Sequence, residues 1–285
     1  TNIDQERLRD LWIGTFHALF SRLLRYDIEK YQDPEGLTWT RQFSIYDETD
    51  SQTLVKEIVS QDMSLDPKRF DPKKIKRAIS NAKNQCFTAN DLEEKADNHF
   101  DKIIADAYKR YRTSLSKNNA LDFDDLLLLP VFLLRQNNLV RDYWHKRFQH
   151  ILVDEYQDTN RTQYELIKLI TAGNTPPNKF CEWNDRSIFV VGDADQSIYS
   201  FRAADFRILI GFQEDFKNSS NSNQKASLVK LEENYRSSSN ILNAANSLIE
   251  NNTERIDKVL RPTKDEGELL KLSLIHISEP TRPAI

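Results

Sequence analysis

Two short apolar runs, each ending in acidic residues, limit the folds that this chain can adopt. They are "HILVDE" at residues 150–155 and "SIFVVGD" at residues 187–193. Neither run alternates apolar and polar residues, so each strand should be buried on both faces, as in a parallel sheet covered by helices. Helical patterns follow the runs, "TQYELIKLI" after the first and "ADFRILIGFQEDF" after the second. This strand–helix–strand–helix order predicts a doubly wound α/β domain, in which ligands bind at the carboxyl ends of the strands.

The carboxylates that follow the first run indicate a cation site. Asp154 and Glu155 are adjacent, and Asp158 follows three positions later. Like charges this close repel, unless a divalent cation such as Mg²⁺, which prefers oxygen ligands, neutralises one of them. Asp154 would then hold the metal, directly or through water, and Glu155 would orient or deprotonate a water that attacks a γ-phosphate. From these residues alone, a strand that simply ends in solvent is the favoured interpretation, and the cation site is the alternative.

Two other segments predict helices. In "TFHALFSRLLR", residues 15–25, apolar side chains recur at the spacing of one helix face, and Thr15 is placed to cap the helix. From residue 26 to about residue 116, short helical patterns are broken by "DPEG", "LDPKRFDPKK" and "TAND", with no strong strand candidate, which predicts a separate, mainly helical subdomain. In "LDFDDLLLLP" the apolar run should end at Pro130, as a helix does when it meets a helix breaker.

Composition places few limits on the partners of the chain. Its 285 residues are 39% hydrophobic, and 40 Lys and Arg against 44 Asp and Glu give a formal net charge of −4. A nucleic-acid partner is neither required nor excluded, because local basic patches matter more than the total. We expect a cytoplasmic protein, since no apolar run approaches the ~20 residues of a membrane span and no signal-peptide pattern opens the chain. The two cysteines, Cys86 and Cys181, indicate neither a disulfide framework nor a zinc site.

Five motifs in order resemble those of the UvrD/Rep/PcrA group of superfamily 1 DNA helicases. "VDEYQDTN" is similar to the second helicase motif of the group, "VVGDADQSIYSFRAAD" to the third and "LEENYRSSSNI" to the fourth. "TFHALFSRLLR" resembles the motif that precedes the inserted subdomain of the family, and "LDFDDLL" the segment where the chain returns to the core. The resemblance covers residues 11–263.

The resemblance implies a domain organisation. We expect a RecA-like parallel sheet with helices on both faces, interrupted by a mainly helical inserted subdomain. Residues 1–25 and 117–226 would form the two parts of the first RecA-like core domain, residues 26–116 the insertion, and residues 227–272 the start of a second RecA-like domain. The segment 273–285, "SLIHISEPTRPAI", leaves the family pattern abruptly and looks like a non-native, out-of-frame or adapter-derived tail.

The resemblance also implies a nucleotide site for ATP and Mg²⁺. Asp154 and Glu155 match the metal-binding and catalytic-base positions, with Glu155 close enough to share the metal. Gln196, in "GDADQ", corresponds to the glutamine that reports the state of the γ-phosphate to the DNA site. Arg236 matches an arginine finger from the second domain, which stabilises charge on the transferring phosphoryl, and Tyr235 would stack on the adenine base.

A third set of positions is implied to bind DNA. Thr15 and His17 match positions that touch the single-strand backbone. Tyr199 and Phe201 place aromatic rings two residues apart beside Arg202, and bases stack on such rings without sequence preference. Family members commonly carry Trp in place of Phe201. The basic run "PKRFDPKKIKRAISNAK" could contact duplex phosphates, and it could equally be a solvated helix face.

We therefore expect a fragment of an ATP-dependent, 3′-to-5′ DNA helicase that couples ATP hydrolysis to translocation on single-stranded DNA and to duplex unwinding. The chain contains no GxxxxGK[ST] match. Without that phosphate-binding loop, the chain alone should hydrolyse ATP negligibly. Two alternatives stay open: a helicase subunit of a recombination helicase–nuclease complex, and a non-catalytic single-stranded DNA-binding module.

Overall fold

The computed structural model describes residues 11–180, 185–197, 205, 207–216, 228–252 and 256–271. The chain divides into two compact units, Thr1–Ala226 and Ser227–Ile285. The tail expected at residues 273–285 lies outside the described residues. Among the described helices, none has the length and apolar character that crossing a membrane requires.

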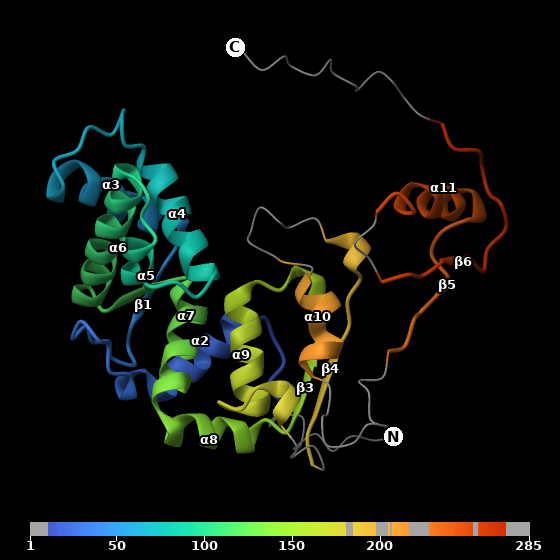
Figure 1. The fold of residues 1–285 in the computed structure, drawn as a ribbon, viewed down its shortest axis with the longest axis horizontal. Helices are drawn as coiled ribbons and strands as arrows, with labels where there is room; N and C mark the ends of the chain where they lie inside the picture. The colour runs from blue at the N-terminus through green and yellow to red at the C-terminus, as the bar shows by residue number, and fades with distance from the viewer. Residues whose placement is uncertain are drawn as a thin grey trace. The chain divides into compact units, whose positions relative to one another are not determined.

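The first unit contains most of the secondary structure (Figure 1). Its helices are α2 (Phe16–Asp27), α3 (Glu48–Glu57), α4 (Pro72–Asn84), α5 (Ala89–Glu94), α6 (His99–Lys117), α7 (Asp125–Gln136), α8 (Asn138–Arg147), α9 (Arg161–Ala172) and α10 (Arg207–Asp215). Its strands are β1 (Ser44–Tyr46), β2 (Ala120–Asp122), β3 (His150–Val153) and β4 (Ser187–Val190). Short 3-10 or π turns are η1 (Ile28–Lys30), η2 (Ile58–Asp62), η3 (Tyr156–Asp158), η4 (Pro177–Lys179) and η5 (Ala194–Gln196).

The predicted strand–helix–strand–helix order is confirmed as β3–α9–β4–α10. Strands β3 and β4 pair in parallel, with Val153 opposite Val190, so their carboxyl ends lie at one edge. Burial on both faces was a wrong expectation for the described structure, because Leu152 is 75% and Phe189 is 58% exposed. These two residues are paired neighbours on one face. On the other face, Ile151 packs against the core formed by the described helices, and Val153 is buried.

The predicted N-terminal helix is confirmed as α2. The Thr15 hydroxyl accepts a hydrogen bond from the Ala18 amide at 3.3 Å, which satisfies one of the free N–H groups of the first turn. Its apolar face contributes Phe20, Leu23 and Leu24 to a core that also contains residues from α7, α8 and α9. This first core supports the helical side of the β3–β4 pair.

Helix α7 does not end at Pro130, contrary to the expectation from the sequence. It continues to Gln136 with the proline inside. A proline in a helix interior removes one backbone hydrogen bond and costs roughly 3 kcal/mol. Apolar side chains on both sides of Pro130, including Leu129, Val131 and Leu133, are 2% exposed or less. Each such burial stabilises the fold by about 1.5–3 kcal/mol, which outweighs the lost hydrogen bond.

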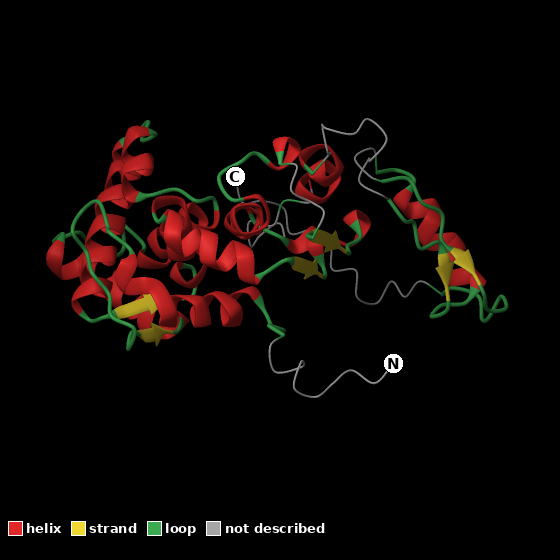
Figure 2. Ribbon diagram, turned by 90° about the horizontal axis from the view of Figure 1, so that it is seen from below, coloured by secondary structure: helices red, strands yellow, loops and turns green. Residues whose placement is uncertain are grey.

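The segment between α2 and β2 is mainly helical, as the sequence indicates, but it also contains an unpredicted strand. Helices α3, α4 and α6 enclose a second core that includes Val59, Ile79, Tyr108 and Tyr111. Strand β1 pairs in parallel with β2, with Ile45 opposite Leu121. This two-stranded sheet is separate from the β3–β4 pair (Figure 2).

A buried ionic cluster joins α4 to β2 and α7. The Lys83 ammonium lies 2.9 Å from Asp122 Oδ2 and 2.7 Å from Asp125 Oδ1, and its side chain is fully buried. Tyr111 donates a hydrogen bond to Asp122 Oδ2 at 2.9 Å. One cation faces two carboxylates and cannot neutralise both, so one carboxyl group ionises more readily than the other. Although burial opposes ionisation, Lys83 holds the pKa of Asp122 at about 2, whereas burial and the Asp122 charge raise the pKa of Asp125 to about 7.

Cys86 lies directly after α4 and contacts the start of α9. Its backbone φ is +62°, in the left-handed region, and its Sγ lies 3.3 Å from Thr162 Oγ1. Burial raises the pKa of the thiol. Cys181, the second cysteine, lies outside the described residues.

The second unit contains α11 (Ser239–Ile249) and the parallel strand pair β5 (Glu233–Asn234) and β6 (Arg261–Pro262). Leu242 of α11 is its buried apolar residue among the described positions. The second unit begins where the sequence changes from a polar stretch to "SLVKLEENYRS".

Candidate functional site

The carboxyl ends of β3 and β4 are held together beyond the last paired residues. The Val191 amide donates to the Val153 carbonyl at 2.8 Å, and the Tyr156 amide donates back to the Val191 carbonyl at 2.9 Å. The two loops that follow the strands therefore lie side by side. One loop begins with Asp154 and Glu155, and the other with Gly192 and Asp193.

Gln157 links these loops through its side chain. Its amide nitrogen donates to Glu155 Oε2 at 2.6 Å, and its amide oxygen accepts from the Asp193 N–H at 2.9 Å. Asp193 Oδ2 in turn accepts from the Gln196 side chain at 2.7 Å. The structure thus brings Asp154, Glu155 and Gln196 to one edge of the β3–β4 pair. Sequence reasoning missed Gln157, and its position between two carboxylates in "DEYQD" was the available signal.

The turn after β3 has an unusual backbone. Glu155 has φ 50° and ψ 43°, a left-handed conformation that costs a non-glycine residue of order 1–3 kcal/mol. The Asp154 carboxylate accepts the Glu155 N–H at 2.9 Å, which helps to hold this turn. Opposite it, a Cβ atom at Gly192 would lie 2.7 Å from Gln157 Oε1. Only glycine lets the second loop approach so closely.

The turn after β3, residues 154–158, has the ligand chemistry of a magnesium site, and we call it the acidic turn. Asp154 and Glu155 are exposed, and Asp158 Oδ1 is buried without a hydrogen-bond partner in the described part of the chain. Burial and the neighbouring Glu155 charge raise the pKa of Asp158. The described residues contain no group of three or more His, Cys, Asp or Glu side chains arranged to hold a metal. A cation here would take one or two carboxylates and complete its shell with water and phosphate oxygens, as Mg²⁺ does.

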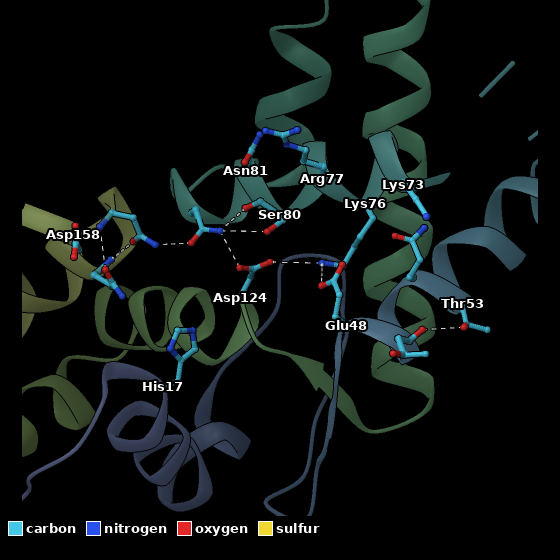
Figure 3. A pocket seen from close by; sticks show the side chains of 15 residues that line it. His17, Glu48, Thr53, Lys73, Lys76, Arg77, Ser80, Asn81, Asp124 and Asp158 are labelled. Atoms are coloured by element: carbon cyan, nitrogen blue, oxygen red, sulfur yellow. Dashed lines mark hydrogen bonds and ion pairs between the residues drawn. The ribbon is translucent and has the colours of Figure 1, made fainter. Parts of the chain in front are cut away.

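A polar groove of about 1020 Å³ lies between the start of α9 and helices α3 and α4 (Figure 3). We call it the polar groove, and its wall from α4 carries Lys73, Lys76 and Arg77. His17 of α2 also lines it and lies 5.9 Å, centroid to centroid, from Phe123. Burial lowers the pKa of His17, so the imidazole is neutral at neutral pH and offers one donor and one acceptor.

A line of side-chain amides connects the acidic turn to the polar groove. Asn160, which caps α9, donates to Asn84 Oδ1 at 2.5 Å, and Asn84 donates to Asp124 Oδ1 at 2.9 Å. The Lys76 ammonium lies 3.8 Å from Asp124 Oδ2. The position of α4 is therefore tied to the start of α9, immediately after the acidic turn (Figure 3).

The other predicted site residues fall elsewhere. Thr15 is exposed and caps α2. Tyr235 and Arg236 belong to the second unit, where Tyr235 is 68% exposed and donates a hydrogen bond to Glu233. The Arg236 N–H is bound by Asn234 Oδ1 at 2.9 Å, and its carbonyl accepts from Lys264 at 3.0 Å.

The three predicted aromatic and basic DNA-binding positions, Tyr199, Phe201 and Arg202, lie outside the described residues.

Comparison with known proteins shows the family of the chain. The family model of the UvrD/REP helicase N-terminal domain matches residues 1–217, and that of the UvrD-like helicase C-terminal domain matches residues 229–279. The ATP-dependent DNA helicase PcrA of Staphylococcus epidermidis (strain ATCC 35984) is 38% identical over 266 residues, 93% of this chain and 33% of the relative. That of Bacillus subtilis (strain 168) is 40% identical over 258 residues, 90% of this chain and 32% of the relative. The chain thus spans about a third of the length of these relatives. The chain belongs to the UvrD/REP helicase family.

Proposed function

We propose that this chain is part of an ATP-dependent DNA helicase that couples ATP hydrolysis to 3′-to-5′ translocation on single-stranded DNA and to duplex unwinding. The observation that carries the proposal is the hydrogen-bonded line from Glu155 through Gln157 and Asp193 to Gln196, which joins the carboxyl ends of β3 and β4. Family membership supports the use of ATP and DNA. We further propose that β3 and β4 belong to a RecA-like sheet and that residues 26–116 form an insertion in it.

In this proposal, Asp154 holds Mg²⁺ directly or through water, with Glu155 near enough to share it. When bound, ATP would supply the transferable phosphoryl group, and Mg²⁺ would supply the positive charge that the carboxylates neutralise. Gln157 binds one Glu155 oxygen, Oε2, and so orients the carboxylate while the other oxygen, Oε1, is left to orient a water and accept its proton. The left-handed backbone at Glu155 supports this role, because sparsely populated backbone conformations cluster at active sites.

Gln196 would report the state of the γ-phosphate, because an amide both donates and accepts hydrogen bonds. Its contact with Asp193, and that of Asp193 with Gln157, ties any movement of Gln196 to the Glu155 loop. For Arg236 and Tyr235 the proposal rests on the family motif: Arg236 would stabilise charge on the transferring phosphoryl, and Tyr235 would stack on adenine.

For DNA we propose that the backbone of a single strand contacts Thr15 and His17, beside the polar groove. A neutral His17 can donate to a phosphate oxygen, and Lys73 and Arg77 add positive charge along the α4 wall. Tyr199, Phe201 and Arg202 would provide stacking surfaces, which suit a motor that moves along any sequence.

The nucleotide role is tested with Glu155→Gln in a protein of full family length that carries this sequence. The isosteric amide cannot accept the proton, so ATP turnover should fall by about 10² or more while nucleotide binding stays nearly unchanged. Glu57→Gln, an exposed glutamate at the end of α3, is the matched control. Unimpaired turnover in Glu155→Gln would show that Glu155 is not the catalytic base.

The DNA role can be tested with this chain itself. Fluorescence anisotropy with a labelled oligo(dT) should show binding that weakens as salt rises, because phosphate contacts release counterions. His17→Ala should weaken binding, and His99→Ala, an exposed histidine at the start of α6, should not. Equal affinities for the two variants would remove His17 from the DNA site.

A further inference from the structure

A second cavity of about 560 Å³ lies near the amino end of β3, the end opposite to the acidic turn. We call it the aromatic pocket, and its wall includes Trp12, Tyr26, Leu139, Tyr143, Trp144 and Arg147. Helix α8 supplies four of these residues and ends three positions before β3 begins. The proposed nucleotide and DNA chemistry uses none of them.

The aromatic rings of the pocket form one connected cluster. The ring centroid of Trp12 lies 5.1 Å from that of Trp144 and 6.5 Å from that of Tyr26, and Tyr143 lies 5.1 Å from Trp144. Tyr26 is 50% and Tyr143 56% exposed, so their rings remain available to a ligand. Leu139 is 83% exposed and lies one helical turn before Tyr143, on the same face of α8.

Trp12 carries a buried donor that the described residues do not use. Its indole Nε1 has no hydrogen-bond partner, whereas the indole of neighbouring Trp144 donates to Asp27 Oδ2 at 2.7 Å. A buried donor without a partner costs about 1–3 kcal/mol. A bound group with a hydrogen-bond acceptor, such as a peptide carbonyl, would remove this cost.

The charge around the aromatic pocket is mainly positive. Lys30, Arg41 and Arg147 line it, and the Arg147 guanidinium lies 5.8 Å from the Trp12 ring centroid. Among the described residues of the lining, the one acidic residue is Asp27, which is 6% exposed and already accepts hydrogen bonds from Trp144 and Lys30. Lys30 pairs with Asp27 at 2.7 Å and Arg41 with Glu29 at 3.3 Å, so Arg147 is the cation of the lining that no described ion pair neutralises, and it favours an acidic ligand.

We propose that the aromatic pocket docks a short acidic peptide segment of a partner protein. An apolar side chain of that segment lies among Tyr26, Leu139 and Tyr143, a backbone carbonyl accepts the Trp12 indole N–H, and flanking carboxylates pair with Arg147. Trp, Tyr and Arg are the residues that dominate the energy of protein–protein contacts, particularly where an apolar centre has a charged rim. A nucleic acid would not use the exposed aliphatic Leu139, so the peptide is the ligand that the lining favours.

The experiment is selection of displayed random peptides on this chain, followed by calorimetric titration of the enriched peptides. The selection should enrich peptides with several acidic residues around one large apolar residue. Tyr143→Ser and Arg147→Glu should each weaken their binding by at least about tenfold. Lys74→Glu, an equal charge reversal on the exposed part of α4, should not weaken it.

A second measurement keeps the proposal independent of any folding defect. Trp12→Phe preserves an aromatic ring and deletes the donor. It should weaken binding of the enriched peptides severalfold without lowering the melting temperature, because it also removes the cost of the unpaired donor. The Trp12 indole signal in ¹H–¹⁵N spectra is identified as the one that the Trp12→Phe variant lacks. Adding the peptide to the unsubstituted chain should shift this signal. No acidic enrichment, equal binding by Tyr143→Ser, or displacement of the peptide by oligo(dT) would each overturn the proposal. Because the test does not involve ATP or the acidic turn, its failure is distinct from failure of the helicase proposal.

Discussion

Replacing Lys83 by methionine should destabilise this chain strongly and in a pH-dependent way. Methionine has a similar volume but removes the one ammonium that faces Asp122 and Asp125 at 2.9 and 2.7 Å. Both carboxylates would then be buried without their cation. Removing one partner of a buried ion pair typically costs about 3–5 kcal/mol.

The sign of the pH dependence follows from the acidity of the two carboxylates. Asp122, with its pKa lowered to about 2, contributes stability above about pH 4 that is lost as the pH falls toward 2. Asp125, with its pKa raised to about 7, contributes stability below about pH 4 that is lost as the pH rises through 7. Without Lys83, Asp122 keeps the more distant charge of Lys76 and Asp125 loses its ion pair, so both groups favour protonation more than they do beside Lys83. The cost of Lys83→Met should be largest near pH 8 and smaller near pH 5.

Urea unfolding followed by circular dichroism at about pH 5 and about pH 8 provides the assay. Lys74→Met removes an exposed lysine from the same helix and serves as the control, with an expected change within about 0.5 kcal/mol. Equal urea midpoints for the two variants at both pH values would refute the reasoning, because the buried cluster would then carry no stability.

Three further changes test individual contacts. Gly192→Ala places a Cβ atom 2.7 Å from Gln157 Oε1 and 3.2 Å from two backbone nitrogens, so it should cost about 1–3 kcal/mol in thermal unfolding. Thr15→Ala removes the α2 cap and should cost about 1 kcal/mol, while Thr15→Ser should restore it, as urea midpoints would show. In a protein of full family length, Asp154→Asn should weaken Mg²⁺-dependent nucleotide binding, because an amide is a poorer ligand for a hard cation. Nucleotide titrations with and without Mg²⁺ would measure the affinity. An unchanged affinity would argue against Asp154 as a ligand of the metal.

The parts of the fold that depend on local patterns were predictable from the sequence. The α2 helix followed from apolar spacing and its Thr15 cap, and the meeting of Glu155 and Gln196 followed from two apolar strands that both end in acidic loops. Strand β1 was not predictable, because its three residues form a strand only by pairing with β2, more than seventy positions later. The prediction that a helix ends at Pro130 was wrong for a related reason. Burial of α7 residues on both sides of Pro130 stabilises the helix more than the proline destabilises it.

The candidate site was predictable in its charged residues and not in its connections. Asp154 and Glu155 stand out because adjacent carboxylates at a strand end are unfavourable without a cation. The role of Gln157 depends on the Asp193 amide of another loop, and that of Asn84 depends on Asn160, 76 positions away. Such pairs are set by tertiary packing, which no sequence window contains.

Cys86 gives this chain a built-in chemical reporter. Its thiol lies against Thr162 where α4 meets α9, and burial raises the pKa of the thiol. The reactive thiolate is therefore scarce while α4 and α9 are packed together. Alkylation by iodoacetamide should therefore be slow until α4 separates from α9, and its rate measures how often that separation occurs. In a Cys181→Ser background, a change in this rate on adding nucleotide or DNA would show whether ligands alter the coupling between the acidic turn and the polar groove.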